Sequence, residues 1–406
     1  MSAITRSGVG SIRIVLGDDH VGDLVVHADD RTEFSLSRDY LALYPRPVLG
    51  QLFEDDLRAT HRARMQLPPW FSNLLWEDRI REVIAAQIGV SPQREAHLLA
   101  YLGDDLPGGL RAIPEGDLPA VSSAETVPRE EGLAHPIKFS LAGAQPKLSM
   151  LREGRGLTFP ATGRGGNFIV KLPGSKFAGV PENEALTMTW ARESGITVPE
   201  FSLEPVASLR NMPPELQGDP GNAFSAKRFD RPMPGKRIHI EDFAQVIGVY
   251  PTFAGKYRKA SYETIGRILL QLHPPSFDEF LRRLVFVILS ANADAHLKNW
   301  SLWYPDRVHA ELAPAYDLVS TIEFIEKDEL GLNLAQSKKW TDAGLRSFES
   351  LAVRVGADPG NVARLVKEAV TRTLDAWPRV RGSASPILVA RLADHWKRVP
   401  LASLGT

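Results

Sequence analysis

Residues 292–299 restrict the fold of this chain more than any other segment, because they place a carboxylate five residues before a carboxamide. The segment reads Asn-Ala-Asp-Ala-His-Leu-Lys-Asn, with Asp294 and Asn299 as the spaced pair, and a second carboxylate follows at Asp317. Kinase-like folds arrange an Asp, an Asn five positions later and a further Asp around metal-bound ATP. The spacing therefore predicts a phosphoryl-transfer site.

Each residue of this set has its own expected task. Asp294 is expected to orient the accepting hydroxyl and to take its proton. Asn299 and Asp317 are expected to hold Mg²⁺ on the phosphates of ATP, because amide and carboxylate oxygens are the hard ligands that magnesium prefers. The alternative is that Asp294 and Asn299 cap a turn after a helix, a position that both residue types favour. Three such residues in kinase order favour the catalytic interpretation.

A lysine for the phosphates is expected at Lys171, which ends the short run 168–171. Kinases place their phosphate-pairing lysine at such a strand position. Glu184, on the helix predicted over residues 182–193, is expected to pair with this lysine, and Glu182 is an alternative partner. Taken alone, a lysine at a strand end would be solvated, and exposed Lys–Glu pairs contribute little to stability.

A phosphate-binding loop is expected at residues 140–147, Ser-Leu-Ala-Gly-Ala-Gln-Pro-Lys, whose small residues allow backbone N–H groups to approach phosphate oxygens. The stretch lacks the glycine spacing and the Gly-Lys-Ser/Thr ending of a Walker loop, so the alternative is a turn before a strand. His296 is expected to support the loop around Asp294 or to contact the ATP phosphates. A zinc site at His296 is not expected, since the chain has no cysteine and no His-x-x-x-His spacing.

The composition predicts a folded protein whose net charge is too small to attract nucleic acid. The chain has 406 residues, a length that is enough for a two-lobed unit or for two to three domains. Hydrophobic residues make up 43%, which supports a folded core. Its net charge of -1 gives no reason to expect direct DNA binding. The first residues lack an apolar run, and the longest aliphatic run, 284–289, is far too short to span a bilayer. We therefore expect a soluble, cytoplasmic protein without membrane contact.

Alternation and turn signals predict the strands. Aliphatic residues alternate with polar ones over residues 11–36, around a Gly-Asp-Asp turn, and predict a hairpin. Residues 108–129 are rich in Gly, Pro, Ser and acids and predict a linker. The charged run 227–231 would normally be a solvated strand end. Further strands are expected over residues 147–159, 168–172 and 224–229.

The chain after Asp242 is predicted to be mostly helical. Ser276-Phe-Asp-Glu279 has the sequence of a capping box and predicts a helix from there to Leu289. Asp358 is predicted to cap another helix, with proline at its first position. Further helices are expected over residues 345–355, 362–377 and 386–398. The predicted fold class is α+β, a two-lobed protein-kinase-like fold with a β-rich N-terminal lobe and a helical C-terminal lobe.

As a set, the motifs of the chain resemble those of the HipA family, the serine/threonine kinase toxins of bacterial type II toxin–antitoxin modules. The motifs that carry the resemblance are residues 21–24, 71–75, 102–104, 140–147, 169–173, 182–184, 227–231, 241–245, 292–299 and 312–318. The resemblance covers nearly the whole chain. It implies an N-terminal subdomain over residues 1–112, a kinase N-lobe with phosphate loop and hinge over 113–229, and a helical C-lobe with the catalytic loop over 230–406.

The resemblance also implies roles that spacing alone does not. Ser140 matches the family's autophosphorylated serine, whose modification expels the phosphate-binding loop and silences the kinase. Lys171 would hold the ATP phosphates, Asp294 would be the base, and Asn299 and Asp317 would hold magnesium. The phosphate-binding loop would comprise Ala142, Gly143, Ala144, Gln145 and Lys147. The hinge that receives adenine through its backbone would comprise Lys227, Arg228 and Phe229.

Partners and substrate are likewise implied by the resemblance. Family members phosphorylate a serine of a cytosolic translation protein, typically an aminoacyl-tRNA synthetase such as the glutamyl enzyme, which halts translation and favours dormancy. A small HipB-like helix-turn-helix antitoxin would bind this chain, and operator DNA would be contacted mainly through that partner. Residues 258–261 lack a glycine pair common in the family, and Leu297 and Trp300 replace the commoner Gly and Phe. These departures lie near the acceptor side and leave the protein substrate open.

Two other functions fit parts of the pattern. A small-molecule phosphotransferase of the antibiotic-kinase type also uses a catalytic Asp with a downstream Asn. A non-catalytic pseudokinase could act as the partner of a DNA-binding repressor. The joint presence of Lys171, Asp294, Asn299 and Asp317 favours a catalyst over a scaffold.

Overall fold

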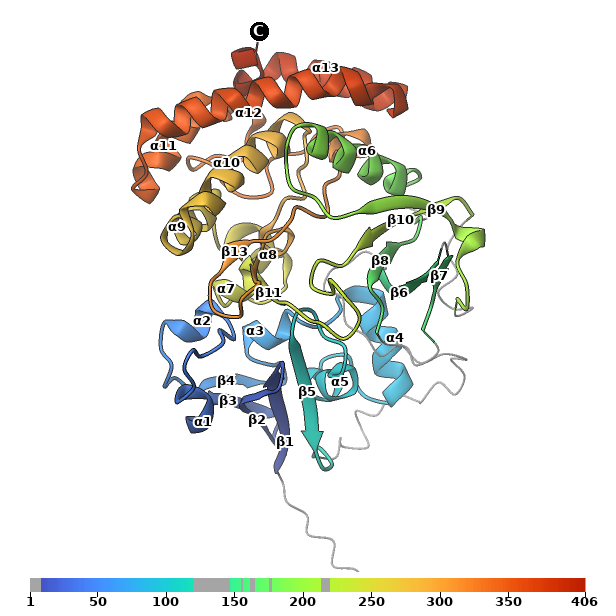
Figure 1. Ribbon diagram of the computed structural model, residues 1–406, viewed down its shortest axis with the longest axis vertical. Helices are drawn as coiled ribbons and strands as arrows, with labels where there is room; N and C mark the ends of the chain where they lie inside the picture. Colours follow the sequence, from blue (N-terminus) through green and yellow to red (C-terminus); the bar gives the residue numbers. More distant parts are fainter. Residues whose placement is uncertain are drawn as a thin grey trace, which may run out of the picture.

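The N-terminal sheet follows from the alternation of aliphatic and polar residues. The structure is a computed structural model that describes residues 9–119, 147–154, 156–160, 165–174, 177–212 and 220–405. Ile12 and Ile14 of β1 and Leu24 of β2 are fully buried, and Gly17, with φ 64°, makes the tight turn between these strands. The predicted hairpin is thereby confirmed. The antiparallel strands run in the order β4-β3-β2-β1-β5 (Figure 1) and are β1 (Val9–Leu16), β2 (Asp19–His27), β3 (Arg31–Leu36), β4 (His61–Arg64) and β5 (Leu110–Glu115).

Strand β5 shows that the predicted linker was wrong over residues 110–115. The strand pairs antiparallel with β1, with Ala112 opposite Ile14. Pro114 is tolerated there because β5 is an edge strand, where a missing N–H breaks no inner ladder. The predicted boundary at residue 112 falls inside this strand, and residues 120–129 of the predicted linker lie outside the described residues. The helices of this N-terminal part are α1 (Arg38–Leu41), α2 (Gln51–Glu54), α3 (Pro69–Ser72), α4 (Asp78–Ile88) and α5 (Glu95–Leu102).

A second sheet carries the two lysines that the sequence singled out. Its order is β7-β6-β8-β10-β9, and it confirms the strands predicted in this region. Strands β6 and β8 pair antiparallel, with Lys147 directly opposite Lys171. Residues directly opposite each other in such a pair point to the same face, so both amino groups lie on one side. The elements are β6 (Lys147–Glu153), β7 (Gly156–Thr158), β8 (Phe168–Lys171), α6 (Val180–Glu193), β9 (Phe201–Pro205) and β10 (Asn222–Lys227).

The C-terminal part is helical, as predicted, around the long buried helix α10. This helix packs against α9 and α12 and is apolar along most of its length. A small sheet, β11-β12-β13, lies beside it. The elements are β11 (His239–Asp242), α7 (Phe243–Val246), α8 (Phe253–Arg258), α9 (Tyr262–Leu272), α10 (Pro274–Leu289), β12 (Ser301–Tyr304), β13 (Glu311–Leu312), α11 (Leu345–Val355), α12 (Pro359–Val380) and α13 (Pro386–Arg398).

The two predicted helix caps have different outcomes. Asp358 caps α12, because its Oδ1 accepts a hydrogen bond of 2.6 Å from the N–H of Asn361. The capping box predicted at Ser276 was wrong, since α10 begins at Pro274, after His273. Ser276 Oγ lies 2.8 Å from His273 Nδ1 and accepts from the N–H of Leu312 at 2.8 Å. Its hydroxyl therefore ties the helix start to β13.

Within the described residues, we find no helix that is both long and apolar enough to cross a membrane. The observed α+β architecture, with a β-rich N-terminal region and a helical C-terminal part, confirms the predicted fold class.

Candidate active site

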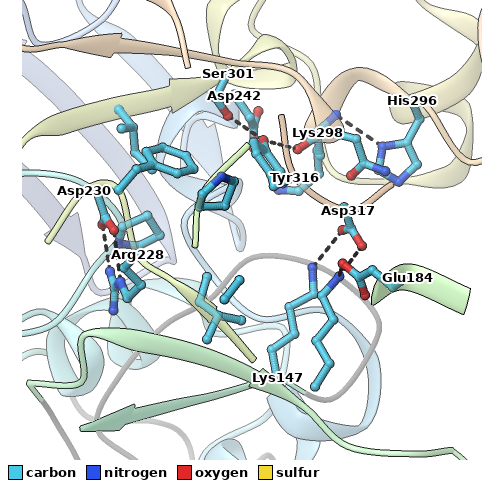
Figure 2. Close-up of a pocket in the computed structure, with 18 of the residues that line it drawn as sticks. Lys147, Glu184, Arg228, Asp230, Asp242, His296, Lys298, Ser301, Tyr316 and Asp317 are labelled. Atoms are coloured by element: carbon cyan, nitrogen blue, oxygen red, sulfur yellow. Dashed lines mark hydrogen bonds and ion pairs between the residues drawn. The ribbon is translucent and has the colours of Figure 1, made fainter. Parts of the chain in front are cut away.

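A cavity of about 280 Å³ collects most of the residues that the sequence predicted to act together (Figure 2). The second sheet, the helical part and the N-terminal part all contribute to its walls. Among the lining residues are Asn73, Lys147, Lys171, Glu184, Lys227, Arg228, Phe229, Asp294, His296, Asn299 and Asp317. Ser140, Ala142, Gly143, Ala144 and Gln145 lie outside the described residues.

Asp317 lies between the two lysines of the second sheet. Lys171 Nζ is 2.5 Å from Asp317 Oδ1, and Lys147 Nζ is 3.0 Å from Asp317 Oδ2. Burial alone would raise the pKa of Asp317, but Lys147 and Lys171 outweigh it and hold this pKa well below its usual range. The carboxylate is therefore ionised. Asp317 adopts φ 59°, an unusual backbone conformation for a non-glycine residue that occurs preferentially at functional sites.

Lys171 also pairs with Glu184, as the sequence predicted. Lys171 Nζ is 2.5 Å from Glu184 Oε1, and both side chains are buried. Burial disfavours the charged form of Lys171, yet Asp317 and Glu184 together keep its pKa above the ordinary value. Burial raises the pKa of Glu184 to about 7. The alternative partner, Glu182, accepts instead from Asn222 Nδ2 at the exposed surface.

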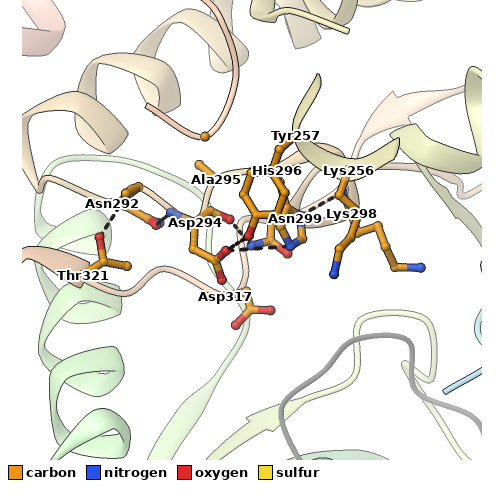
Figure 3. A network of polar contacts seen from close by, with 12 residues as sticks. Lys256, Tyr257, Asn292, Asp294, Ala295, His296, Lys298, Asn299, Asp317 and Thr321 are labelled. Carbon is orange, nitrogen blue, oxygen red and sulfur yellow. Dashed lines mark hydrogen bonds and ion pairs between the residues drawn. The ribbon is translucent and has the colours of Figure 1, made fainter. Parts of the chain in front are cut away.

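The loop after α10 presents Asp294 to the cavity (Figure 3). Asn292 Oδ1 accepts from the N–H of Asp294 at 3.0 Å, and Asn299 Nδ2 donates to the backbone carbonyl of Asp294 at 2.7 Å. Of the two residues in the capping alternative, Asn299 thus holds the loop backbone, together with Asn292. The Asp294 side chain is 55% exposed, at the cavity rim, where an acceptor can reach it.

His296 supports this loop in its neutral form. Its Nδ1 accepts from the N–H of Lys298 at 3.2 Å, within the short helix η3 (Leu297–Asn299). Burial lowers the pKa of His296 to about 3, so the ring is uncharged at neutral pH. Its Nε2 lies 3.9 Å from Asp294 Oδ1. This geometry matches the first alternative for His296, support of the loop around Asp294.

Arg228, Asp230 and Arg231 of the charged run 227–231 are buried, and Lys227 and Phe229 are half-buried, so the expectation of a solvated strand end was wrong. Arg228 donates two hydrogen bonds to the Asp230 carboxylate, at 3.0 and 2.8 Å, and Arg231 Nη1 donates a third at 2.7 Å. Arg231 also contacts Asp105, which comes from the N-terminal part. Burial alone would raise the pKa of Asp230, but the two arginines hold it far below its ordinary range. Paired charges can be buried where single ones cannot.

Two residues of the N-terminal part, Asn73 and Glu77, contact lysines that line the cavity. Lys298 Nζ donates to the backbone carbonyl and to Oδ1 of Asn73, both at 3.0 Å. Lys256 Nζ lies 2.6 Å from Glu77 Oε2. Sequence reasoning missed both contacts, which join residues more than 170 positions apart, because no local pattern links them.

Tyr257 was also missed as a site residue. Its hydroxyl donates a hydrogen bond to Asp294 Oδ1 (Figure 3). A tyrosine has no motif that would identify a partner 37 residues away.

Two family models match the chain, one described as the HipA N-terminal domain, over residues 12–113, and one as the HipA-like C-terminal domain, over residues 139–377. Among similar proteins, Y4dM of Sinorhizobium fredii strain NGR234, named as a candidate kinase, is 40% identical over 376 residues. That match covers 90% of each chain. The serine/threonine-protein kinase toxin HipA of Shewanella oneidensis strain MR-1 is 24% identical over 353 residues, with 76% of this chain and 77% of that protein covered.

The fold comparison agrees with the sequence comparison. The chain is similar to the structure of the Shewanella oneidensis HipA, HipB and operator DNA complex, with a TM-score of 0.72 and 21% identity. The match covers 97% of this chain and 96% of the other. The predicted kinase-like fold with an additional N-terminal region is thereby confirmed. The chain belongs to the HipA family.

Proposed function

We propose that this chain is a serine/threonine protein kinase that uses ATP and Mg²⁺ and acts as the toxin of a type II toxin–antitoxin system. The observation that carries the proposal is the convergence of Asp294, Asn299, Asp317 and the Lys171–Glu184 pair on one cavity. The names of its relatives, a candidate kinase and a kinase toxin, support the reaction class. The buried ion pairs are a reason to prefer a catalyst over a pseudokinase scaffold.

The reaction transfers the γ-phosphoryl group of ATP to a serine or threonine hydroxyl. The hydroxyl oxygen forms a bond to the γ-phosphorus, the bond to the β–γ bridging oxygen breaks, and ADP leaves with that electron pair. Asp294 takes the proton of the acceptor hydroxyl. Lys147 and Lys171 neutralise charge on the phosphates, which is the main electrostatic task of such a site.

The residues around the cavity fit a magnesium ion. Asp317 offers an ionised carboxylate, and Asn299 offers its carboxamide oxygen, since its amide nitrogen is engaged with the Asp294 carbonyl. Magnesium in kinases takes one or two such protein oxygens together with substrate phosphates and water. Bound there, it would neutralise charge on the phosphates during transfer.

Other parts of the proposal follow from family membership. Residues 227–229 would receive adenine through their backbone, residues 142–147 would cover the phosphates, and His296 would lie near them. Phosphorylation of Ser140 would switch the enzyme off. The domain divisions near residues 112 and 229 belong to the same proposal.

The proposed partners are a HipB-like antitoxin and a cytosolic translation protein, with an aminoacyl-tRNA synthetase such as the glutamyl enzyme as the first candidate substrate. The fold likeness to a HipA chain solved with HipB and operator DNA supports an antitoxin partner. The net charge of -1 is consistent with DNA contact mainly through that partner. All of these encounters would take place in the cytoplasm.

The proposal is tested by incubating purified protein with ATP and Mg²⁺ and measuring intact mass and phosphopeptides. Phosphate is expected on Ser140 in the wild type and absent in Asp294→Ala. Asp375→Ala, at an exposed position of α12, is the matched control. Equal phosphate on the wild type and Asp294→Ala would overturn the assignment of Asp294 as base.

A further inference from the structure

Tyr257 contacts the proposed base directly, and the proposed function gives it no task. Its hydroxyl, on α8, donates to Asp294 Oδ1 on the loop after α10 (Figure 3). A carboxylate has two oxygens, each able to accept more than one hydrogen bond. A phenol on Oδ1 therefore leaves Oδ2 for the hydroxyl of an acceptor. The contact also restricts rotation of the Asp294 carboxylate, which would otherwise turn Oδ2 away from the acceptor hydroxyl.

The tyrosine ring is itself held by three neighbours. It stacks on Phe253 with ring centroids 4.9 Å apart and forms a T-shaped contact with the His296 ring, with centroids 4.8 Å apart and an interplanar angle of 90°. Lys338 Nζ lies 5.7 Å from the ring centroid. Burial, with the Asp294 charge as the next cause, raises the pKa of Tyr257 far above its ordinary value, so the phenol stays a donor at neutral pH. The hydroxyl is therefore a fixed donor aimed at Asp294.

Helix α8 is anchored through the residue before Tyr257. Lys256 Nζ forms an ion pair of 2.6 Å with Glu77 Oε2, and the Glu77 side chain is only 9% exposed. The other oxygen of Glu77 lies 3.7 Å from Lys298 Nζ, on the same loop as Asp294. One carboxylate of the N-terminal part thus faces both the helix that carries the phenol and the loop that carries the base. Glu77, a residue of the N-terminal part, therefore helps to fix the position of α8 relative to the loop that carries Asp294.

We propose that Tyr257 is a positioning residue that holds the Asp294 carboxylate in the orientation in which Oδ2 meets the acceptor hydroxyl. The inference rests on the proposed function and deepens it. The proton of the acceptor passes to Asp294, and the phenol keeps its own proton throughout. Tyr257 acts through Asp294 and does not touch the phosphoryl group.

Tyr257→Phe tests the proposal, because it keeps the ring contacts and removes only the hydroxyl. The assay measures transfer from radiolabelled ATP with Mg²⁺ to the chain itself, as rate at saturating ATP and as KM for ATP. The maximal rate is expected to fall about tenfold or more, with KM for ATP changed less than about twofold. The melting temperature is expected to stay within about 2 °C of the wild type. Tyr44→Phe, at a side chain that is 99% exposed, is the control.

The outcomes separate the inference from the function on which it rests. If the wild type exceeds Asp294→Ala and Tyr257→Phe equals the wild type, only the positioning role of Tyr257 is overturned. A wild type no faster than Asp294→Ala overturns the proposed function and this role together. Phosphate mapped to Tyr257 itself would make the residue an acceptor and would also overturn the role. A loss of melting temperature or a rise in KM for ATP that accounts for the slower rate would make Tyr257 structural.

Discussion

The substitution Asp230→Asn tests two interpretations of the charged run 227–231. The structure buries Asp230 in an ion-pair network, whereas the local sequence favours a solvated strand end. Asp230 is 4% exposed and accepts from Arg228, from Arg231 and from the N–H of Gly108 at 2.9 Å. Asparagine has nearly the same shape, but it carries no charge. One of its two terminal groups is also an N–H donor that would face the guanidinium donors.

The expected cost follows from what is left unpaired. The substitution removes the negative charge between two buried guanidinium groups, of which Arg231 keeps only the contact with Asp105 as a carboxylate partner among the described residues. Removing one partner of a buried ion pair costs about 3–5 kcal/mol. At a solvated strand end the same change would cost less than about 0.5 kcal/mol. The two interpretations therefore differ by roughly 2.5 kcal/mol or more.

Thermal unfolding at pH 7 distinguishes these values. A cost of about 3–5 kcal/mol is expected to lower the melting temperature by about 6–10 °C, given a shift of roughly 2 °C per kcal/mol in a large domain. Asp117→Asn, at an exposed position after β5, is the control and is expected to leave the melting temperature within about 1 °C. An Asp230→Asn protein that melts with the control would refute the buried network.

Two further predictions concern the pH dependence of stability and the binding of ATP. Burial lowers the pKa of His395 from 6.5 to about 4, so its contribution to stability is complete above pH 6.5 and is lost as the pH falls from 6.5 to 4. Between pH 7 and pH 5 this residue alone should cost about 2 kcal/mol. His395→Gln should therefore lose less stability over this interval in urea unfolding, and an unchanged pH dependence would contradict the shift. Lys171→Met is expected to lower kcat/KM for ATP by about 100-fold or more, since a buried cation that neutralises transferring phosphate is worth several kcal/mol. A change below about threefold in steady-state assays, with the fold intact, would exclude Lys171 from the phosphate site.

Local patterns predicted much of this fold because they report local physics. Helix α11 and helix α13 have the predicted bounds, since apolar spacing and proline at a helix start act within a few residues. The capping box failed because Ser276 has a stronger use, a bond to His273 and to the start of β13. Strand β5 was missed because composition indicates a linker while pairing with the distant β1 decides the structure.

In the candidate site, too, some features were predictable from the sequence and others depended on the tertiary structure. That Asp294, Asn299 and Asp317 line one cavity was predictable, because kinase-like folds bring these residue types together in this order. The buried state of Arg228, Asp230 and Asp105 was not, because burial of a charge depends on a partner brought by the fold. The contacts of Tyr257, Lys256 and Lys298 were hidden for the same reason. Each joins the site to a residue that only the tertiary structure brings near.

One comparison decides whether the chain transfers phosphoryl groups with Asp294 as base. The transfer of the γ-phosphate of ATP to protein is measured for the wild type and for Asp294→Asn, each with Mg²⁺ and with the metal removed by chelation. We expect transfer by the wild type with Mg²⁺, a loss of about 100-fold or more in Asp294→Asn, and no transfer without the metal. Equal rates in the two folded proteins would exclude Asp294 as the base, and transfer that is unchanged by chelation would exclude the role of Mg²⁺.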